Sequence, residues 1–361
     1  MTKAAELAKM GEVLTNSQIG GRRNMIINGA MQVAQRGTSQ ASITSTGYYT
    51  IDRWQVAITN GGTWTMSQDT DVPTGEGFAN SLKMDCTTAD TSFGASDSLY
   101  VRTKLESQDC QNMKKGTSSA EKVTLRFWVK SSKTGTHIVE LLDNDNSRFV
   151  SLAYTISSAN TWENHTLTFP ADTTGAFADD NGVGLGIHWY MGAGSNISSG
   201  TLGTTWHTTQ ANRAAGQVNL ADSTDNNWYL TGVQLEVGSQ ATPFEHRSYG
   251  EELQLCKRYF HKTGGTAYCN IGTVTNFSSG AMLGPYKHPV EMRSAPSVTK
   301  SGDWAVLGGD TTVNQTAVSS DSNGKVSEIG FASGSGGTSG RSATLRFNND
   351  ADAYLHWDAE I

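Results

Sequence analysis

The stretch that decides the fold is EKVTLRFWVKS, residues 121–131. Apolar side chains occupy every second position from Val123 to Val129, and the positions between them are mostly polar. This period of two is that of a β-strand, whose successive side chains point to opposite faces of a sheet. The stretch therefore predicts a strand with one face in a hydrophobic core.

The same pattern continues along the chain in both directions. Residues 136–142 and 148–156 flank the turn Asp143-Asn144-Asp145-Asn146, which predicts a β-hairpin. Further strands are predicted at 161–169, 184–191 and 228–237. Seven or more short strands in residues 23–247, with no convincing helix between them, predict an all-β sandwich.

One long segment of this region lacks strand signals. Residues 192–225 consist mostly of Gly, Ser, Thr, Asn and Ala, with Trp206 and Leu220 as the main exceptions. Such a composition supplies little material for a core, so a long loop is predicted, or a ribbon that only neighbouring segments order.

The first 22 residues predict a separate element. Leu7, Met10 and Leu14 recur at spacings of three and four, which gives a short helix with one apolar stripe, and Gly20-Gly21 ends it. A helix of this length is marginal in water without a partner surface. We therefore expect residues 1–22 to attach or trimerise the protein; a frayed terminus is the alternative.

The C-terminal part begins with another break in the β pattern. Ser248 and Glu251 fit a capping box, so a linking helix is predicted over residues 248–262. A smaller β domain is expected at 263–361, with few aliphatic residues and hence a thin core. Its last two strands are predicted to form a terminal hairpin from residues 343–347 and 354–357.

Composition and charge exclude several classes of protein. Of the 361 residues, 36% are hydrophobic and 17% are charged, while the chain has 39 Gly. This suits short strands joined by many turns, because Gly, Asn and Ser supply turn conformations. The formal net charge of −7 argues against a sequence-independent nucleic-acid binder, which needs clustered Lys and Arg.

Cysteine and hydropathy patterns indicate where the protein is made. The four cysteines show no C-x-x-C arrangement and no nearby histidine at metal spacing, so free thiols in a reducing cytoplasm are expected. No apolar run approaches the roughly 20 residues of a membrane span, and no signal peptide is recognised. We expect assembly in a reducing cytoplasm, release by lysis if the protein leaves the cell, and no membrane insertion. The four cysteines are Cys86, Cys110, Cys256 and Cys269.

A set of short motifs resembles those of a known family. Near the N-terminus they are Arg23–Met31, Gln35-Arg36-Gly37 and Asp52-Arg53-Trp54. Further along they are Trp228–Gly238, Thr242–Glu245, Tyr249–Phe260 and Asp358–Ile361. Together these motifs resemble tail-fibre and virion appendage proteins of tailed bacteriophages. The resemblance implies a jelly-roll β-sandwich similar to carbohydrate-binding modules, displayed on a virion and homotrimeric.

Three aromatic residues are candidates for contact with a glycan. Trp189 and Tyr190 are adjacent in a predicted strand, so they point to opposite faces and at most one belongs to the core. Trp206 lies in the polar segment, where burial is harder to explain. A subunit interface is the alternative for all three, because Trp and Tyr are enriched there.

Two other motifs have a structural interpretation that outweighs the functional one. Asp52-Arg53-Trp54 offers planar groups for stacking on a sugar, but Trp54, Val56 and Ile58 share one strand face, which favours a core position for Trp54. Asp143–Ser147 resembles half of a calcium loop, yet the Gly and Glu that such a loop requires are missing. We expect it to be a hairpin turn.

The sequence gives little support to an enzyme. A glycosidase needs two carboxylates on either side of the scissile bond, and Asp179 with Asp180 lie side by side in a turn-like segment. Neither G-x-S-x-G nor H-E-x-x-H occurs, and the eight histidines show no metal spacing. We expect no catalytic activity, no metal and no cofactor.

The function expected from these observations is that of a structural and adhesive subunit of a phage fibre or appendage. It would join other tail or capsid proteins through its N-terminus and bind host-surface glycan. A ligand-free connector or capsid decoration protein is the first alternative, and a polysaccharide depolymerase is the second. No internal repeat of fixed period supports the latter.

Overall fold

The chain forms two compact units in the computed structural model, Met1–Tyr249 and Gly250–Ile361. Both consist mainly of antiparallel strands, so the predicted all-β fold class is confirmed. The predicted helix with Leu7, Met10 and Leu14 lies outside the described residues. The structure describes residues 3–4, 23–278, 281–307, 323–332 and 339–361.

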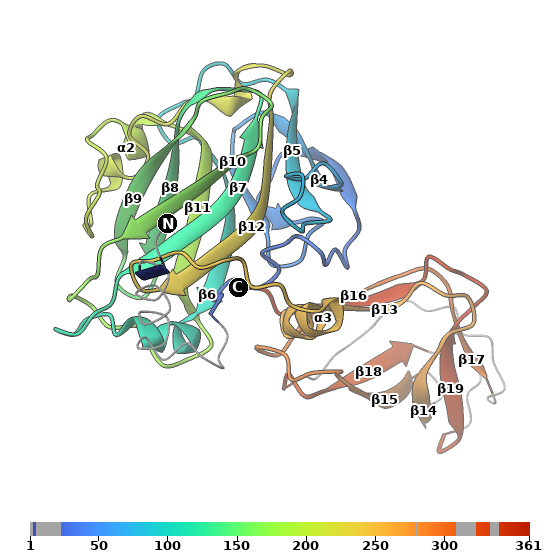
Figure 1. Ribbon diagram of the computed structural model, residues 1–361. Coiled ribbons are helices and arrows are strands. Elements are labelled where there is room, and N and C mark those ends of the chain that lie inside the picture. The colour runs from blue at the N-terminus through green and yellow to red at the C-terminus, as the bar shows by residue number, and fades with distance from the viewer. Residues whose placement is uncertain (1–2, 5–22, 279–280, 308–322, 333–338) are drawn as a thin grey trace. The chain divides into compact units, whose positions relative to one another are not determined.

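Two six-stranded antiparallel sheets make up the first unit (Figure 1). Sheet one has the order β1 (Ser39–Ile43), β4 (Thr63–Asp69), β5 (Ser81–Thr88), β12 (Asn227–Val237), β7 (Val123–Ser131), β10 (Glu163–Phe169). Sheet two has the order β2 (Gly47–Tyr48), β3 (Gln55–Thr59), β6 (Ser98–Glu106), β11 (Val183–Ala193), β8 (Gly135–Asp143), β9 (Arg148–Ile156).

Strands β5 to β12 have jelly-roll connectivity. Each strand is followed by one in the other sheet, except for the hairpin β8–β9. The resulting orders, β5-β12-β7-β10 and β6-β11-β8-β9, are those of two interleaved Greek keys. Strands β1 and β4 extend sheet one, and β2 and β3 extend sheet two. The jelly-roll sandwich is therefore present in residues 23–249.

The core lies between the two sheets and is rich in tryptophan. Trp54, Trp64, Trp189 and Trp228 are fully buried there. One aromatic side chain buries roughly 150–250 Å², so these four supply a large share of the hydrophobic stabilisation. The alternation predicted in residues 121–131 is confirmed, because Leu125, Phe127 and Val129 are buried while Arg126 and Trp128 are partly exposed.

The predicted hairpin is also confirmed. Strands β8 and β9 pair from Gly135 with Ile156 to Asp143 with Arg148, and residues 144–147 form the turn. The turn carboxylate Asp143 is buried against Lys115 at 2.5 Å, so it serves an ion pair. The interpretation of Asp143–Ser147 as a turn holds, and no group of metal-ligating side chains occurs among the residues that the structure describes.

Most of the segment 192–225 forms a long loop, the first of the two expected alternatives; Gly192 and Ala193 still belong to β11. The loop contains α2 (Ser195–Ser198), η2 (Gln210–Asn212) and η3 (Leu220–Asp222). The loop contains more buried residues than its composition indicates, since Ala214, Leu220 and Ala221 are fully buried. Small side chains and backbone hydrogen bonds to the rest of the first unit therefore order it.

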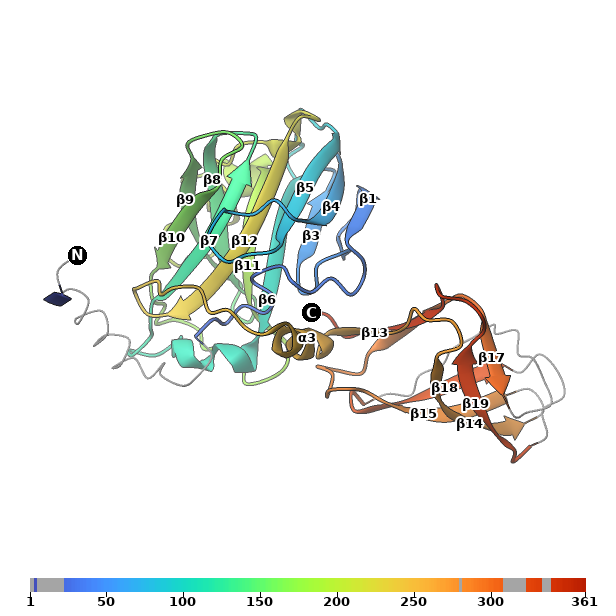
Figure 2. The same ribbon diagram turned by 45° about the vertical axis from the view of Figure 1, so that its right-hand side comes forward.

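The second unit contains α3 and two smaller sheets (Figure 2). The predicted linking helix is present but shorter than expected, as α3 (Tyr249–Lys257). The three-stranded sheet has the order β13 (Phe260–Gly264), β20 (Tyr354–Asp358), β16 (Ser297–Ser301). The five-stranded sheet has the order β17 (Trp304–Leu307), β19 (Ser342–Phe347), β14 (Asn270–Ser278), β15 (Ala281–Lys287), β18 (Val326–Ala332).

The prediction of a terminal hairpin is wrong. Strand β19 pairs with β14 and β17, whereas β20 pairs with β13 and β16 in the other sheet. The intervening residues 348–353 carry the chain from one sheet to the other. Phe347, Leu355 and Trp357 are fully buried in one core, so the two strands share packing without sharing hydrogen bonds.

Candidate functional site

The three predicted glycan residues lie in three different environments. Trp189 is fully buried between the sheets, with ring centroids 5.4 Å from Trp54 and 5.9 Å from Phe127. Its assignment to a glycan site is therefore wrong, because no part of the ring reaches solvent. Tyr190 points to the opposite face, as the alternation requires, and is also fully buried, there under the 192–225 loop. Its ring therefore supports the partly exposed Tyr100 from behind and is not itself a contact surface for a glycan.

A small pocket of about 230 Å³ lies beside Tyr190, on the outer face of sheet two. Four segments of the chain build it: a turn, the first residues of β6, the middle of β11, and the loop. Because strands place these residues by register and not by sequence proximity, the pocket is a product of the fold. It is lined by Ala95, Ser96, Ser98, Tyr100, Tyr190, Asn196, Ile197 and Arg213.

The sheet positions the two tyrosines of the pocket. Tyr100 of β6 pairs directly with Tyr190 of β11, which brings the ring centroids to 5.2 Å. Two residues earlier on β6, Ser98 falls on the same face. Tyr100 also stacks on His188, with centroids 4.8 Å apart and an angle of 25° between the rings. The aromatic wall is therefore held by β-sheet register.

The loop closes the pocket on another side. The Asn196 backbone N–H donates to the Ala95 carbonyl at 2.9 Å, and the Asn196 side-chain amide donates to the Ser96 hydroxyl at 3.0 Å. The Ala214 N–H donates to the Ile197 carbonyl at 2.8 Å. These bonds join α2 and the segment around Arg213 to the turn before β6, so that both borders of the pocket have fixed positions.

A buried carboxylate anchors the arginine of the pocket. Glu140 of β8 is fully buried, and Arg213 donates to both its oxygens, from Nε to Oε2 at 2.7 Å and from Nη2 to Oε1 at 2.7 Å. His188 Nδ1 lies 3.0 Å from Oε1, and the Tyr190 hydroxyl donates to Oε1 at 3.3 Å. A bidentate arginine pair of this kind is strong and directional.

The ionisation states follow from these contacts. Burial opposes ionisation of Glu140, but hydrogen bonds from Arg213 and His188 lower its pKa below the ordinary value. Burial likewise opposes the charge on Arg213, yet the Glu140 carboxylate raises the pKa of that guanidinium. Burial lowers the pKa of His188 to about 4, despite its bond to Glu140. At neutral pH the network is one ion pair with a neutral imidazole.

The pocket keeps polar groups available for a ligand. Among the described residues, the hydroxyl groups of Ser98 and Tyr100 have no hydrogen-bond partner. The side-chain amide nitrogen of Asn196 is engaged with Ser96, whereas its carbonyl oxygen accepts no hydrogen bond from a described residue. Two hydroxyls and one amide carbonyl beside an aromatic wall match the donors, acceptors and apolar C–H faces of a sugar ring.

Trp206 does not belong to this pocket. Its ring is half-buried against the sandwich core, its indole N–H donates to the Pro170 carbonyl at 2.8 Å, and the Lys115 ammonium lies 5.2 Å from the ring centroid. Lys115 is itself buried between Asp143 and Asp172. The indole therefore covers a buried ion cluster, which explains an aromatic residue in so polar a segment.

The Asp52-Arg53-Trp54 motif is structural. Trp54 is fully buried, and its indole N–H donates to the Asn28 carbonyl at 3.1 Å. The Asp52 carboxylate accepts from the Gln35 backbone N–H at 2.9 Å. Arg53 is also buried and donates to the Lys104 carbonyl at 2.6 Å. No ring of this motif is exposed to a sugar.

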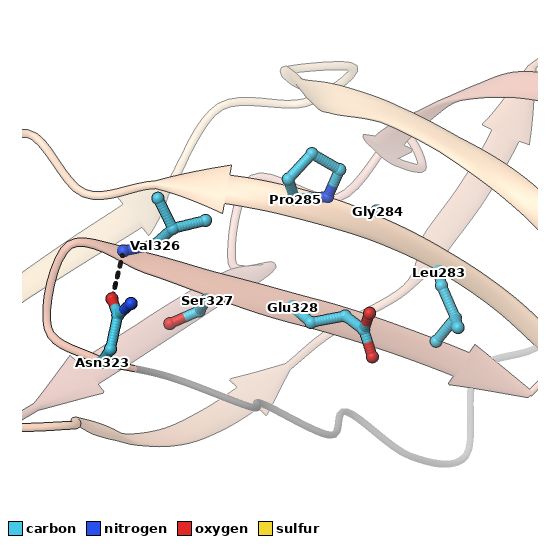
Figure 3. A pocket seen from close by; sticks show the side chains of 7 residues that line it. All are labelled: Leu283, Gly284, Pro285, Asn323, Val326, Ser327 and Glu328. Carbon is cyan, nitrogen blue, oxygen red and sulfur yellow. Dashed lines mark hydrogen bonds between the residues drawn. The ribbon is translucent and has the colours of Figure 1, made fainter.

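A second pocket, of about 490 Å³, lies along β15 and β18 in the second unit (Figure 3). Its serine, Ser327, is fully buried and shares a hydrogen bond of 2.7 Å with His288, which is 2.9 Å from His261. This row of three polar side chains is satisfied within the core. The lining is Leu283, Gly284, Pro285, Asn323, Val326, Ser327 and Glu328, with no aromatic residue, so we consider it the weaker candidate.

Comparisons with known proteins give similarity in structure only. No protein-family model matches the chain, and no curated protein matches it. The bacteriophage CBA120 tailspike protein 4 enzymatically active domain has a TM-score of 0.32 at 15% identity, over 59% of this chain and 21% of that chain. The present chain thus spans about a fifth of that protein's length.

Two sugar-binding proteins are similar over the same share of the chain. A putative sugar binding protein from Bacteroides thetaiotaomicron has a TM-score of 0.31 at 12% identity, covering 60% of this chain and 100% of that one. TmCBM61, solved in complex with β-1,4-galactotriose, has a TM-score of 0.30 at 10% identity, covering 60% and 99%. All these TM-scores are below 0.5, so the assignment of a site depends on the geometry above.

Sequence reasoning found Tyr190 but missed the rest of the pocket. Tyr100, Glu140 and Arg213 carry no local motif, and Glu140 is 73 positions before Arg213. The signal that could have found them is strand register, because β8 pairs Glu140 with His188 of β11. That pairing cannot be read from one sequence. Within the described residues, no helix is long and apolar enough to cross a membrane.

Proposed function

We propose that this protein is a non-catalytic adhesive subunit whose first unit binds carbohydrate in the pocket beside Tyr100 and Tyr190. The observation that carries the proposal is the combination of an aromatic wall, unengaged hydroxyls and a rigid ion pair beneath them. A fixed pocket loses little side-chain entropy when a ligand binds, so a few contacts suffice for measurable affinity.

The chemistry of the pocket fits a sugar better than other small ligands. The partly exposed Tyr100 ring offers an apolar surface to the C–H face of a pyranose, while Ser98, Tyr100 and Asn196 offer hydrogen bonds to its hydroxyls. The pocket carries no thiol and no carboxylate in its lining. Hydrolysis of a glycosidic bond needs two carboxylates roughly 5–9.5 Å apart, which supports binding over catalysis.

We further propose that the protein is a homotrimeric fibre or appendage subunit of a tailed phage. The support is the resemblance of the motifs in residues 23–54 and 228–260 to those of phage tail-fibre and virion proteins. A small site binds one glycan weakly. Three copies on one particle would raise the effective concentration and give firm attachment to a host surface.

The direct test is binding of the full chain to a glycan array, with Tyr100→Ala as the site variant. Removing the ring takes away both the apolar wall and one hydroxyl, so we expect array binding to fall by at least about tenfold. The matched control is Tyr249→Ala, because Tyr249 is 56% exposed and does not line the pocket. Near-ultraviolet circular dichroism would show that both variants are folded.

The alternatives predict different results in the same experiment. A ligand-free connector would bind no glycan, and the proposal would then fail for the intact protein. A depolymerase would release oligosaccharides from host capsule or lipopolysaccharide, which chromatography of the supernatant would detect. Equal loss of binding in Tyr100→Ala and Tyr249→Ala would place the glycan somewhere other than this pocket.

A further inference from the structure

The size of the pocket limits what it can hold. Its volume is about 230 Å³, below the ~300–1,000 Å³ that is usual for sites of drug-sized ligands. An oligosaccharide of several rings does not fit inside such a volume. One sugar ring does.

The loop prevents a glycan in the pocket from extending across β8 and β9. Beyond the pocket, the Ser151 N–H donates to the Gly203 carbonyl at 2.9 Å, and Phe149 and His207 exchange backbone hydrogen bonds of 2.8 and 2.9 Å. The Val218 N–H donates to the Thr136 carbonyl at 3.1 Å. These backbone bonds lie in the plane of the sheet and hold the loop to the edges of β8 and β9. Between them the loop crosses the outer face, where Ala214 clusters with Ile138 and Tyr190 and the Arg213 guanidinium lies 4.3 Å from the Phe149 ring centroid.

The side chains on the outer face of β8 and β9 are buried, as expected if the loop covers these strands. Ile138, Glu140 and Ser151 are fully buried, and Phe149 is 3% exposed. A polysaccharide that entered the pocket would therefore meet the loop on the side of β8 and β9. Binding of the interior of a glycan requires the chain to leave the pocket in two directions, and the loop closes this one.

The charge of the pocket further restricts the ligand. Arg213 is the one charged residue in the lining, and its guanidinium is already paired with both oxygens of Glu140. Another arginine, Arg102, lies 5.6 Å from the Tyr100 ring centroid and donates from Nε to Gln55, but it does not line the pocket. A ligand carboxylate inside the pocket would lose water without meeting an unpaired cation in the lining, which is unfavourable.

We infer that the pocket recognises one uncharged sugar residue at the end of a glycan chain or branch. This inference depends on the proposed carbohydrate-binding function and specifies its ligand class. It differs from recognition of the interior of a chain, in which affinity grows as more rings are contacted.

The chain-end part is tested by calorimetry with oligosaccharides that share one terminal residue, starting from the methyl glycoside that binds best on the array. We expect the affinity to stay within about threefold from one ring to five, because the additional rings contact nothing. A cyclic glycan of the same sugar, which has no chain end, is expected not to bind. A rise of more than about tenfold with length, or binding of the cyclic glycan, would overturn the inference.

The charge part is tested with a neutral methyl hexoside and the methyl uronide of the same configuration. We expect the uronide to bind at least about tenfold more weakly; equal or tighter binding would overturn this part. In Glu140→Gln the guanidinium loses its counter-charge, so the ratio of uronide to hexoside affinity is expected to rise. The wild-type comparison decides the point even if that variant does not fold.

Failure of the inference and failure of the proposed function give separate results. If no sugar of any length binds to the full chain, the carbohydrate-binding function itself is wrong. If the affinity rises more than about tenfold with length, or a cyclic glycan binds, and Tyr100→Ala abolishes this binding, the function stands and the chain-end inference is wrong.

Discussion

Glu140 is the residue on which the geometry of the pocket depends. It is fully buried and receives Arg213, His188 and Tyr190 on its two oxygens. A buried ion pair of this kind adds little net stability compared with apolar residues, but removal of one partner leaves an uncompensated charge. The network is therefore better suited to holding the arginine and tyrosine in place than to stabilising the fold.

A charge-removal series tests this role. Arg213→Ala leaves the Glu140 carboxylate buried without its cation, and we expect the sandwich to lose about 3–5 kcal/mol in urea denaturation. The double variant Glu140→Leu/Arg213→Met should recover part of this loss. The control Lys114→Ala breaks the exposed pair with Glu121 and should cost about 0–1 kcal/mol. A loss below about 1 kcal/mol in Arg213→Ala would contradict the assigned role.

The buried histidine pair of the second unit predicts a pH dependence. Burial, and then the neighbouring His288, lower the pKa of His261 to about 3, and burial lowers the pKa of His288 to about 4. In the unfolded chain both histidines take up a proton near pH 6.5. Below that pH, down to the folded-state pKa values, the unfolded state therefore binds more protons than the folded state. The stability of this unit is therefore complete above about pH 6.5 and falls as the pH drops toward 4.

Hydrogen exchange of individual peptides measures this loss of stability within the second unit itself. Peptides covering β13 and β15, which carry or border the two histidines, should lose protection progressively from pH 6.5 to 4. In His261→Phe the loss should be smaller, because one of the two titrating groups is gone. A local readout is necessary because His137 and His188 in the first unit also have pKa values lowered to about 4, mainly by burial.

At the scale of the element, β12 shows how a single glycine shapes a strand. Gly232 has a φ of +62° and lies where the pairing of β12 with β7 shifts register. A Cβ at this position would lie 2.7 Å from the Phe78 ring and 3.0 Å from the Trp128 ring. The backbone angle and the close packing both require glycine here.

Substitution of this glycine is expected to destabilise the sandwich. Gly232→Ala should cost about 1–3 kcal/mol, because alanine is strained at positive φ and displaces two aromatic rings. The control is Gly272→Ala, since a Cβ on Gly272 would meet no atom within 4 Å and the residue has no positive φ. Thermal unfolding followed by tryptophan fluorescence compares the two; equal melting temperatures for both variants would refute the explanation.

At the scale of the whole molecule, the proposed attachment function depends on copy number. The pocket is small, and a single site of this size gives weak binding. Multivalent display on a fibre or appendage would compensate through effective concentration. The proposed trimer and the proposed glycan site therefore support one another physically, although they were inferred from different features.

The oligomeric state is measured by light scattering coupled to size-exclusion chromatography. We expect the mass of three chains at micromolar concentration. The triple variant Leu7→Ser/Met10→Ser/Leu14→Ser removes the apolar stripe of the predicted N-terminal helix and should shift the protein toward monomer if that helix trimerises it. A monomeric wild-type protein would contradict the trimer and leave the pocket unaffected.

The sequence by itself determined the strands of the sandwich. Alternation in residues 121–131 and the turn at 143–146 specify β7 and the β8–β9 hairpin, because a period of two and a tight turn are local properties of the chain. The same local signals placed Trp54 in the core and separated the faces of Trp189 and Tyr190.

Only the tertiary structure decided which faces are covered and which strands are neighbours. Tyr190 is buried because a loop of small residues crosses sheet two, and the same loop brings Arg213 to Glu140. Glu140 meets His188 because β8 lies beside β11. The pairing of β20 with β13 across almost a hundred residues likewise leaves no local trace. Which distant strands share hydrogen bonds is set by the order of the strands within a sheet. A local pattern of polar and apolar residues carries no information about that order.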